Sequence, residues 1–354
     1  MYAFKVVTVL FKLFIAFFLY PVYFLFRLRI KEDKIVIGTR NGESGYDNGE
    51  IYYSYLQDKN NIHVNFISRK LNHKDRSTIK KNSIRANLIV LNSDIIYVTH
   101  SQSDIIDYWW RLLLFKKIIF MQHGVIGIKK LPEYERKKFD AIVASNEYEY
   151  AIFKKYYAYN SNNIIKCGLP RFDFYSVSES CPLQVKTCLI MFTWRKHYED
   201  NNMFRIKKVV EKLKKIDPSI IIYIASHEMA RRSYSKPLKD ITFVSSQDIS
   251  NVIKSTDLLI TDFSSVAWDY LYQNKLVCFI QDDLKDYIDS EGVYYEEESF
   301  FGHFIKSYDD IDMFFLDEII NSNKTNNARF LSKYHFYAHG TKKHAELLYS
   351  ETRG

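Results

Sequence analysis

Short apolar segments alternate with helical patterns along most of the chain, and this alternation begins again near residue 187. Such alternation is typical of βα units, whose strands lie parallel in one sheet with helices on its faces. In the first half we expect strands at residues 34–39, 62–68, 86–100, 116–124, 140–146 and 163–175. In the second half we expect strands at residues 187–195, 219–228, 240–246, 257–262 and 275–283. The sequence therefore predicts an α/β protein with two Rossmann-like domains.

A polar segment that contains a proline, SVSESCPLQ at residues 176–184, separates the two halves. Domain boundaries commonly lie in segments of this composition, and a chain of 354 residues is long enough for two domains. We therefore expect an N-terminal segment, two Rossmann-like domains and a C-terminal helical segment, at residues 1–30, 31–180, 181–325 and 326–354.

The N-terminal segment is almost wholly apolar between residues 3 and 28. Basic residues follow it where a secretory signal would carry a cleavage site, namely Arg27, Arg29 and Lys31. Its uninterrupted apolar part, residues 13–26, is shorter than the roughly 20 residues that a spanning helix needs. We expect a helix in the interface of an anionic membrane, with a true span or a helix buried against the protein as alternatives. The basic flank would keep the remaining chain on the cytoplasmic face.

The chain carries a formal net charge of +8. A basic excess suits an acidic partner, which could be nucleic acid, anionic lipid or a phosphorylated substrate. The four cysteines form no CxxC pair, and the sequence contains no paired carboxylates in a metal-binding pattern. We therefore expect no metal and no cofactor, and the segments described next favour a phosphorylated substrate over nucleic acid.

Polar side chains follow several of the predicted strands, at the ends where open parallel sheets bind ligands. These segments are residues 123–124, 168–171, 193–195, 226–227 and 261–265. Serine hydroxyls and backbone N–H groups at the start of a helix bind phosphate, and arginine pairs with phosphate through two parallel hydrogen bonds. A neutral histidine can accept a proton from an attacking hydroxyl. Together these segments predict a site for a phosphorylated ligand.

The stretch LLITDFSSVAWDY, residues 258–270, places hydroxyl groups where a strand turns into a helix. We expect Ser264 and Ser265 to hold a diphosphate there, with an ordinary helix N-cap as the alternative. Carboxylates repel phosphate, so we expect Asp262 and Asp269 to accept hydrogen bonds that fix the turn, or to hold a sugar hydroxyl. A histidine after a strand also has an alternative role, as a hydrogen-bonded loop residue.

Seven stretches, in order along the chain, resemble the CDP-glycerol glycerophosphotransferase family, which contains teichoic acid primases and polymerases. They are GESGYDNGEIYYSYL, FMQHGVIGIKKL, DAIVASNEYEYAIFKKYY, IIKCGLPRFDF, LIMFTWR, DLLITDFSSVAWDYLYQNKLVCFIQDDLKDY and YHFYAHGTKKHAELL. The resemblance runs from about residue 38 to the end of the chain, and TDFSS followed by an aspartate is its most specific part.

The resemblance implies a GT-B-type architecture, in which two Rossmann-like domains face each other across a cleft, and peripheral association with the membrane. It implies transfer of an alcohol phosphate, glycerol phosphate above all, from a CDP-linked donor to a hydroxyl of a lipid- or glycan-linked acceptor. The first domain would then hold the acceptor and the second would bind the CDP-alcohol. The product would be a teichoic acid of the cell wall or a capsule-type polymer.

The resemblance also implies roles for single residues. His123 would be the general base that deprotonates the acceptor hydroxyl, and His227 would contact the donor diphosphate or the leaving CMP. Asp269 would lie near ribose or glycerol, and Arg171 would support the cleft. The donor diphosphate would be held by Arg195, Thr261, Ser264 and Ser265.

The chain departs from the family pattern beside several of these residues. Gln122 and Val125 flank the His-Gly pair where many members have Trp and Thr, and Phe263 replaces a tyrosine. These departures leave the donor open between CDP-glycerol, CDP-ribitol and another CDP-alcohol. Two other functions are alternatives: a GT-B glycosyltransferase that uses a nucleotide sugar, and a non-catalytic membrane-bound scaffold for polymer export.

Overall fold

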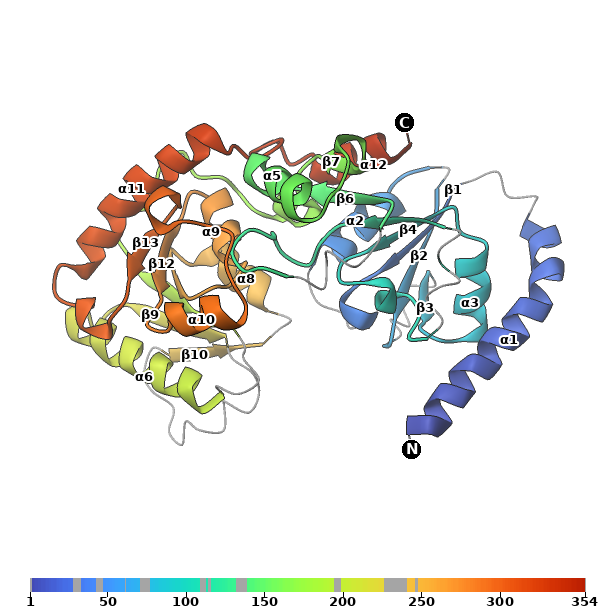
Figure 1. Cartoon of the computed structure of the whole chain (residues 1–354), viewed down its shortest axis with the longest axis horizontal. Helices are drawn as coiled ribbons and strands as arrows, with labels where there is room; N and C mark the ends of the chain where they lie inside the picture. Colours follow the sequence, from blue (N-terminus) through green and yellow to red (C-terminus); the bar gives the residue numbers. More distant parts are fainter. Residues whose placement is uncertain are drawn as a thin grey trace.

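Two parallel β-sheets stand side by side, one in each half of the chain (Figure 1). The computed structural model describes residues 2–27, 33–42, 47–60, 62–70, 77–108, 113, 116–131, 139–193, 199–225, 241–245 and 248–353. Helices cover the faces of both sheets, so the predicted pair of Rossmann-like domains is confirmed.

The first sheet has seven strands in the order β3-β2-β1-β4-β5-β6-β7, all parallel. Its strands are β1 Asp33–Gly38, β2 Ile62–Ser68, β3 Thr78–Lys80, β4 Ile95–Val98, β5 Lys117–Phe120, β6 Ala141–Ala144 and β7 Ile164–Lys166. Its helices include α2 Asn48–Gln57, α3 Ile84–Leu91 and α5 Glu147–Tyr156. The strand order reverses between β1 and β4, and ligands of such sheets bind at the carboxyl ends of the strands beside that point.

The second sheet has six parallel strands in the order β10-β9-β8-β11-β12-β13. Its strands are β8 Thr187–Ile190, β9 Ile221–Ala225, β10 Ile241–Val244, β11 Leu258–Thr261, β12 Leu276–Ile280 and β13 His303–Ile305. Its described helices include α6 Glu199–Ile216, α8 Ile249–Ser255, α9 Ala267–Tyr272, α10 Leu284–Ser290 and α11 Phe315–Lys333. Here the order reverses between β8 and β11, which places the turn after β11 at the second ligand-binding edge.

One predicted strand is half wrong. Residues 86–100 were expected to be strand material, but the structure has α3 at Ile84–Leu91 and only β4 as a strand. The Ser83 side chain accepts a hydrogen bond from the backbone N–H of Ala86 and caps the helix. A short buried helix and a buried strand have the same apolar composition, so periodicity alone could not separate them.

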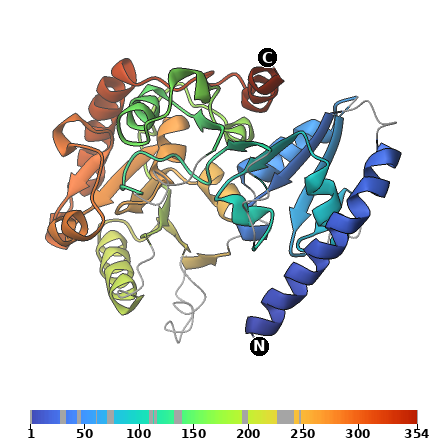
Figure 2. The ribbon, with the colours of Figure 1, turned by 45° about the vertical axis from the view of Figure 1, so that its right-hand side comes forward.

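The C-terminal part divides between the two domains. Helix α11 packs on β12 and β13, and the expected boundary at residue 326 falls inside it. Helix α12, His344–Arg353, returns to the first domain and packs on α2 and on the short 3-10 helix η5, Pro170–Phe174 (Figures 1 and 2). Its backbone begins with two N–H groups that donate to Asp173, each at 2.9 Å. The chain therefore crosses between the domains twice.

Aromatic side chains fill the space between the two domains. The ring of Phe172, in the first domain, stacks on Tyr272 of α9 with a centroid distance of 4.1 Å. Trp268 of α9 lies so close to Gly127 that a Cβ atom on this glycine would be 2.5 Å from the indole ring. Gly127 therefore has to be a glycine for the domains to approach as they do, and the domains share one buried core.

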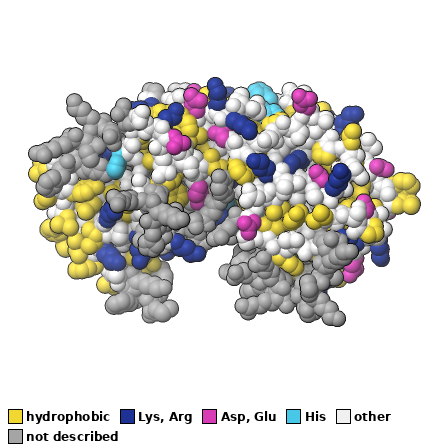
Figure 3. Space-filling view, turned by 180° about the vertical axis from the view of Figure 1, so that it is seen from behind, with side chains coloured by type: hydrophobic (Ala, Val, Ile, Leu, Met, Phe, Trp, Pro, Cys, Tyr) yellow, Lys and Arg dark blue, Asp and Glu magenta, His cyan; other side chains and the backbone are white. Residues whose placement is uncertain are grey.

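The N-terminal helix α1, Tyr2–Arg27, lies along the outside of the first domain and packs on α3 (Figure 2). Leu13 and Ala16 are buried, whereas much of the remaining apolar surface is exposed, including Val7, Phe11, Phe14, Phe17, Phe18, Val22 and Leu25. Figure 3 shows hydrophobic side chains gathered at the edge of the molecule where α1 lies. The helix continues through Lys12 and Pro21, so the segment Val6–Leu25 has 20 residues with a mean hydropathy of 2.0. By length and composition this segment could cross a membrane. The argument that the apolar part, residues 13–26, is too short for a span was therefore wrong.

A buried arginine ties α6 to the second sheet. The Arg205 guanidinium contacts the carboxylates of Asp262 and Asp282 at 3.2 and 2.6 Å, and its Nε–H donates to the hydroxyl of Tyr308 at 2.9 Å. Its side chain is only 6% exposed. A buried ion is tolerated only when its partners stay in place, because removal of one partner leaves an uncompensated charge.

We therefore expect Arg205→Met to lower the free energy of unfolding by about 3–5 kcal/mol, since two carboxylates lose their partner. Lys212→Met is the matched control, because Lys212 is on the same helix as Arg205 and forms an exposed ion pair with Asp309. This control should lose about 1 kcal/mol or less. Urea unfolding followed by circular dichroism measures both values, and equal losses for the two variants would contradict the structural role of Arg205.

Candidate functional site

The loop that carries His123 follows β5 and is fixed by buried side chains. Gln122 has a φ of +67°, a left-handed backbone that is uncommon for a residue other than glycine. Its side chain donates to the carbonyl of Val143 and accepts from the N–H of Ile126. The Glu149 carboxylate accepts from the same N–H at 2.7 Å. Burial raises the pKa of Glu149 to about 7, and its hydrogen bonds oppose that rise. The loop therefore has a fixed shape before any ligand binds.

The His123 ring is oriented by a buried carboxylate. Its Nδ1 lies 2.7 Å from Oδ2 of Asp47, which caps the first turn of α2. Burial alone would raise the pKa of Asp47, but His123 and Arg171 hold it below its ordinary value, so this carboxyl is ionised at neutral pH. An ionised carboxylate favours the tautomer with hydrogen on Nδ1, which leaves Nε2 able to accept a proton. The ring is 44% exposed, so a substrate can reach it.

Arg171 joins this loop to the second domain. Its guanidinium donates to the carbonyl of His123 and to Oδ2 of Asp269, each at 2.7 Å. Burial raises the pKa of Asp269 to about 6 although Arg171 favours the ionised form. Arg171 therefore connects the loop of His123 to helix α9, and its side chain is mostly buried.

A pocket of about 470 Å³ lies between the domains at this place. Its lining residues come from the loops after β4 and β5 and from the turn after β11, namely His100, Phe120, His123, Gly124, Val125, Ile126, Gly127, Ile128, Lys129, Leu131, Phe263 and Ser265. A Cβ atom on Gly124 would be 2.5 Å from the hydroxyl of Ser265, so these two residues are in close contact. The pocket thus has an imidazole from the first domain and a hydroxyl from the second.

Three polar residues at the end of β11 and in the turn after it, Thr261, Asp262 and Ser264, do not line the pocket. The Thr261 hydroxyl donates to the carbonyl of Met191 at 2.6 Å, and Thr261 is buried. Ser264 is buried, and its Oγ accepts from the N–H of Val266 at 3.4 Å, within the turn that precedes α9. Asp262 accepts from the N–H groups of Thr193 and Phe263, each at 2.7 Å. The expectation that this aspartate fixes the turn is confirmed.

The predicted site residues are therefore at the pocket, buried away from it, or outside the described residues. His123 and Ser265 line the pocket, and Arg171 supports it. Thr261 and Asp269 are buried and paired within the protein, so this conformation does not expose them to a donor. Ser264 has little exposed surface. Arg195 and His227 lie outside the described residues. The donor-binding roles of all these residues stay predictions.

Sequence reasoning missed the carboxylates that hold the loop. Asp47 was visible only as part of an Asp-Asn pair before a helix, and Glu149 as a helix residue. Neither pattern indicates a partner, because each partner lies far away in the chain. Among the residues that the structure describes, no cluster of three or more His, Cys, Asp and Glu side chains could hold a metal ion. The expectation that no metal is needed stays a prediction.

Comparison with known proteins gives relatives over most of the chain. The chain is 26% identical over 352 residues to the minor teichoic acid biosynthesis protein GgaB of Bacillus subtilis, covering 86% of this chain and 38% of that protein. It is 25% identical to a teichoic acid glycerol-phosphate primase of Bacillus subtilis, covering 67% of this chain and 64% of that protein. The chain thus spans less than two thirds of either relative.

Solved structures agree with the fold. A variant of the wall teichoic acid polymerase TagF superimposes with a TM-score of 0.72 at 17% identity, covering 98% of both chains. Another TagF structure was soaked with CDPG. This likeness confirms the GT-B-type arrangement of the two Rossmann-like domains.

A family model described as CDP-glycerol:poly(glycerophosphate) glycerophosphotransferase matches residues 21–349. The match includes both sheets, the interdomain pocket and all the predicted site residues. The seven stretches quoted from the sequence all lie within the matched residues. The chain therefore belongs to the CDP-glycerol:poly(glycerophosphate) glycerophosphotransferase family.

Proposed function

We propose that this protein transfers an alcohol phosphate, glycerol phosphate above all, from a CDP-linked donor to a hydroxyl group of a lipid- or glycan-linked acceptor. The observation that carries the proposal is the pocket in which an oriented imidazole from one domain meets a serine from the other. Family membership supports the reaction class, and the teichoic acid relatives support the polymer class. The names of these relatives refer to teichoic acid, so they support a teichoic acid product more than a capsule-type polymer.

In the proposed reaction the acceptor oxygen attacks the phosphorus that carries the alcohol. A new P–O bond forms, the bond from that phosphorus to the bridging oxygen breaks, and CMP leaves with the electron pair. The acceptor proton passes to Nε2 of His123. The Asp47 carboxylate stabilises the imidazolium that results, because the two groups are 2.7 Å apart. The imidazole that takes the proton and the carboxylate that stabilises it are thus already in position before the reaction begins.

The second domain contributes to the donor side. Ser265 lies against Gly124, next to His123, and its hydroxyl can donate to a phosphate oxygen that enters the pocket. Arg171 has an indirect role, because it donates to the carbonyl of His123 and contacts the second domain through Asp269. The predicted donor contacts of Arg195 and His227 remain part of this proposal.

We also propose that α1 holds the protein peripherally at the cytoplasmic face of an anionic membrane. The helix exposes phenylalanine side chains that an aqueous solvent does not favour. A helix that spans the membrane would have to lose its contact with the first domain. Instead, α1 packs along α3, with Leu13 and Ala16 buried against the protein. This geometry supports burial of the outer face of α1 in the membrane interface.

The donor class is tested by ligand binding and product analysis. We expect CDP-glycerol or CDP-ribitol to raise the thermal unfolding midpoint, and UDP- and GDP-sugars to leave it unchanged, because binding to the folded state stabilises it. Mass spectrometry of products made from a panel of CDP-alcohols and a lipid-linked acceptor then identifies the transferred alcohol. Stabilisation by nucleotide sugars alone would favour the glycosyltransferase alternative, and binding without turnover would favour the scaffold.

The base assignment predicts the effect of two substitutions. His123→Ala should lower kcat by about 10²–10⁴-fold, because general base catalysis is lost. Asp47→Asn should lower kcat less, since the ring remains and only its charged partner is removed. CMP release in the presence of acceptor measures both effects. His303→Ala is the control, because His303 lies on β13 and does not line the pocket. Full CMP release by His123→Ala would refute the assignment.

The membrane proposal predicts the result of vesicle flotation. The full chain should float with vesicles that contain anionic lipid, and Phe14→Gln with Phe18→Gln should reduce the bound fraction, roughly tenfold in partition coefficient. Met313→Gln with Phe314→Gln is the matched control, because these two apolar side chains are together at least as exposed but lie in the second domain. Equal flotation of the two double variants would contradict the role of α1.

A further inference from the structure

Two basic side chains in the interdomain pocket have no part in the reaction proposed above. His100 and Lys129 both line the pocket beside His123. The rings of His100 and His123 have a centroid distance of 6.0 Å. Among the described residues that line the pocket, none is an aspartate or a glutamate. The described lining of the pocket therefore offers hydrogen-bond donors and an ammonium group, and it includes no carboxylate that would repel an anion.

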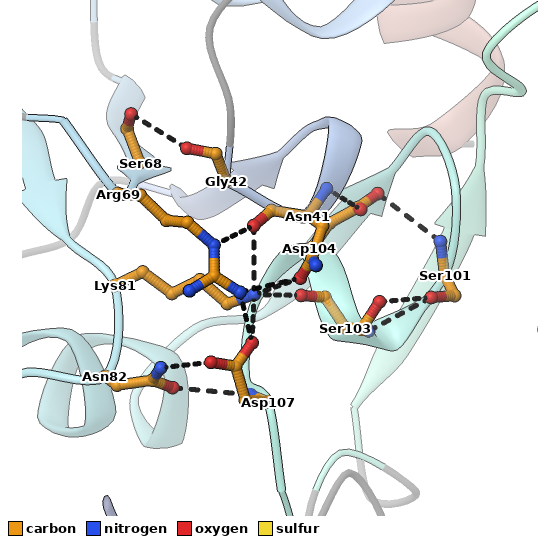
Figure 4. Close-up of polar contacts among 10 residues, drawn as sticks. All are labelled: Asn41, Gly42, Ser68, Arg69, Lys81, Asn82, Ser101, Ser103, Asp104 and Asp107. Atoms are coloured by element: carbon orange, nitrogen blue, oxygen red, sulfur yellow. Dashed lines mark hydrogen bonds and ion pairs between the residues drawn. The ribbon is translucent and has the colours of Figure 1, made fainter. Parts of the chain in front are cut away.

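The loop that carries His100 is fixed by the buried carboxylate of Asp104. Figure 4 shows this carboxylate with its partners Asn41 and Ser101. Asp104 accepts hydrogen bonds from the backbone N–H groups of Thr99, His100 and Ser101, at 2.9, 2.7 and 3.4 Å. It also accepts from the N–H of Asn41, at 2.7 Å, in the loop after β1. One carboxylate thus ties together the loops at the carboxyl ends of β1 and β4, where the strand order reverses.

A buried lysine strengthens the same arrangement. Lys81 is only 1% exposed, and its ammonium contacts the carboxylate of Asp107 at 2.5 Å and Oδ1 of Asn41 at 2.6 Å (Figure 4). It also donates to the carbonyl of Ser103. Burial lowers the pKa of Lys81, although Asp107 favours its charged form. Burial of a charge is costly, and the network in which this charge is buried also fixes the backbone of His100, an exposed residue.

The backbone of Lys129 is held by the second domain. Lys129 forms an isolated antiparallel bridge with Val293. The neighbouring N–H of Lys130 donates to the carbonyl of Gly292 at 3.0 Å, and the N–H of Tyr294 donates to the carbonyl of Ile128 at 2.9 Å. The position from which the Lys129 side chain extends is therefore set by contacts between the domains, as the position of His100 is set by the network around Asp104.

We propose that His100 and Lys129 form a binding subsite for a phosphate-type anion of the acceptor, next to the hydroxyl that His123 deprotonates. The proposal rests on the proposed function. Both residues belong to the first domain, like His123, whereas the serine that faces the donor comes from the second. An ammonium and an imidazole N–H are suitable donors to phosphate oxygens. The anion could belong to the outer end of a phosphate polymer or to a diphosphate that links the acceptor to its lipid.

The test compares three synthetic acceptors that share one alkyl chain and one disaccharide. The first is neutral, the second carries a glycerol phosphate unit at its outer end, and the third has a diphosphate between lipid and sugar. With CDP-glycerol in excess, kcat/KM for each acceptor is measured for the full-length enzyme. We expect Lys129→Ala and His100→Gln to lower the ratio of kcat/KM for a charged acceptor to that for the neutral one, roughly tenfold or more.

Two controls make the outcome specific. Lys130→Ala should leave the ratio unchanged, because Lys130 is on the same loop and does not line the pocket. Lys129→Arg should retain most of the ratio, because it keeps the positive charge. A selective loss with the second acceptor assigns the subsite to the polymer end, and a selective loss with the third assigns it to the lipid diphosphate. Equal losses with all three acceptors, or an increase in KM for CDP-glycerol alone, would overturn the proposal. Failure of the proposed function would differ, since the unsubstituted enzyme would then transfer to no acceptor.

Discussion

The candidate site depends on one ionic contact between the domains. Arg171 donates to the carbonyl of His123 in the first domain and to the carboxylate of Asp269 in the second. The pair is buried, and such burial is tolerated because the ions are 2.7 Å apart. The same cation thus fixes the backbone of the proposed base and the helix that follows the serine turn. Movement of one domain against the other would disturb both.

Buried acidic groups hold the loops of the pocket in place. Asp47 orients the imidazole, Glu149 holds the loop after β5, and Asp104 holds the loop after β4. Burial raises the pKa of Glu149 and of Asp104, so this arrangement has an electrostatic cost. The benefit for a phosphotransferase is that polar groups in a fixed geometry need no rearrangement when charge develops during the reaction.

The sequence predicted most strands and the two-domain organisation, because alternation of apolar segments and turns is a local pattern. It failed at residues 86–91, where a capped helix has the composition of a buried strand. It located the turn at 261–265 at a ligand-binding edge but not the direction of its side chains. Thr261 turns inward to the carbonyl of Met191, whereas Ser265 lines the pocket. Side-chain direction depends on neighbours that a strand-end position does not reveal.

The sequence by itself determined the class of fold, the family and the positions of His123 and Ser265 after their strands. Each of these can be read from local patterns, either in one stretch or in several stretches along the chain. Only the tertiary structure decided that Asp47 is the partner of His123, 76 positions away, and that Arg171 pairs with Asp269, 98 positions away. It also decided that α12 returns to the first domain and that α1 exposes its phenylalanines. The physical reason is that these contacts form when separate parts of the chain pack together, so no local pattern contains them.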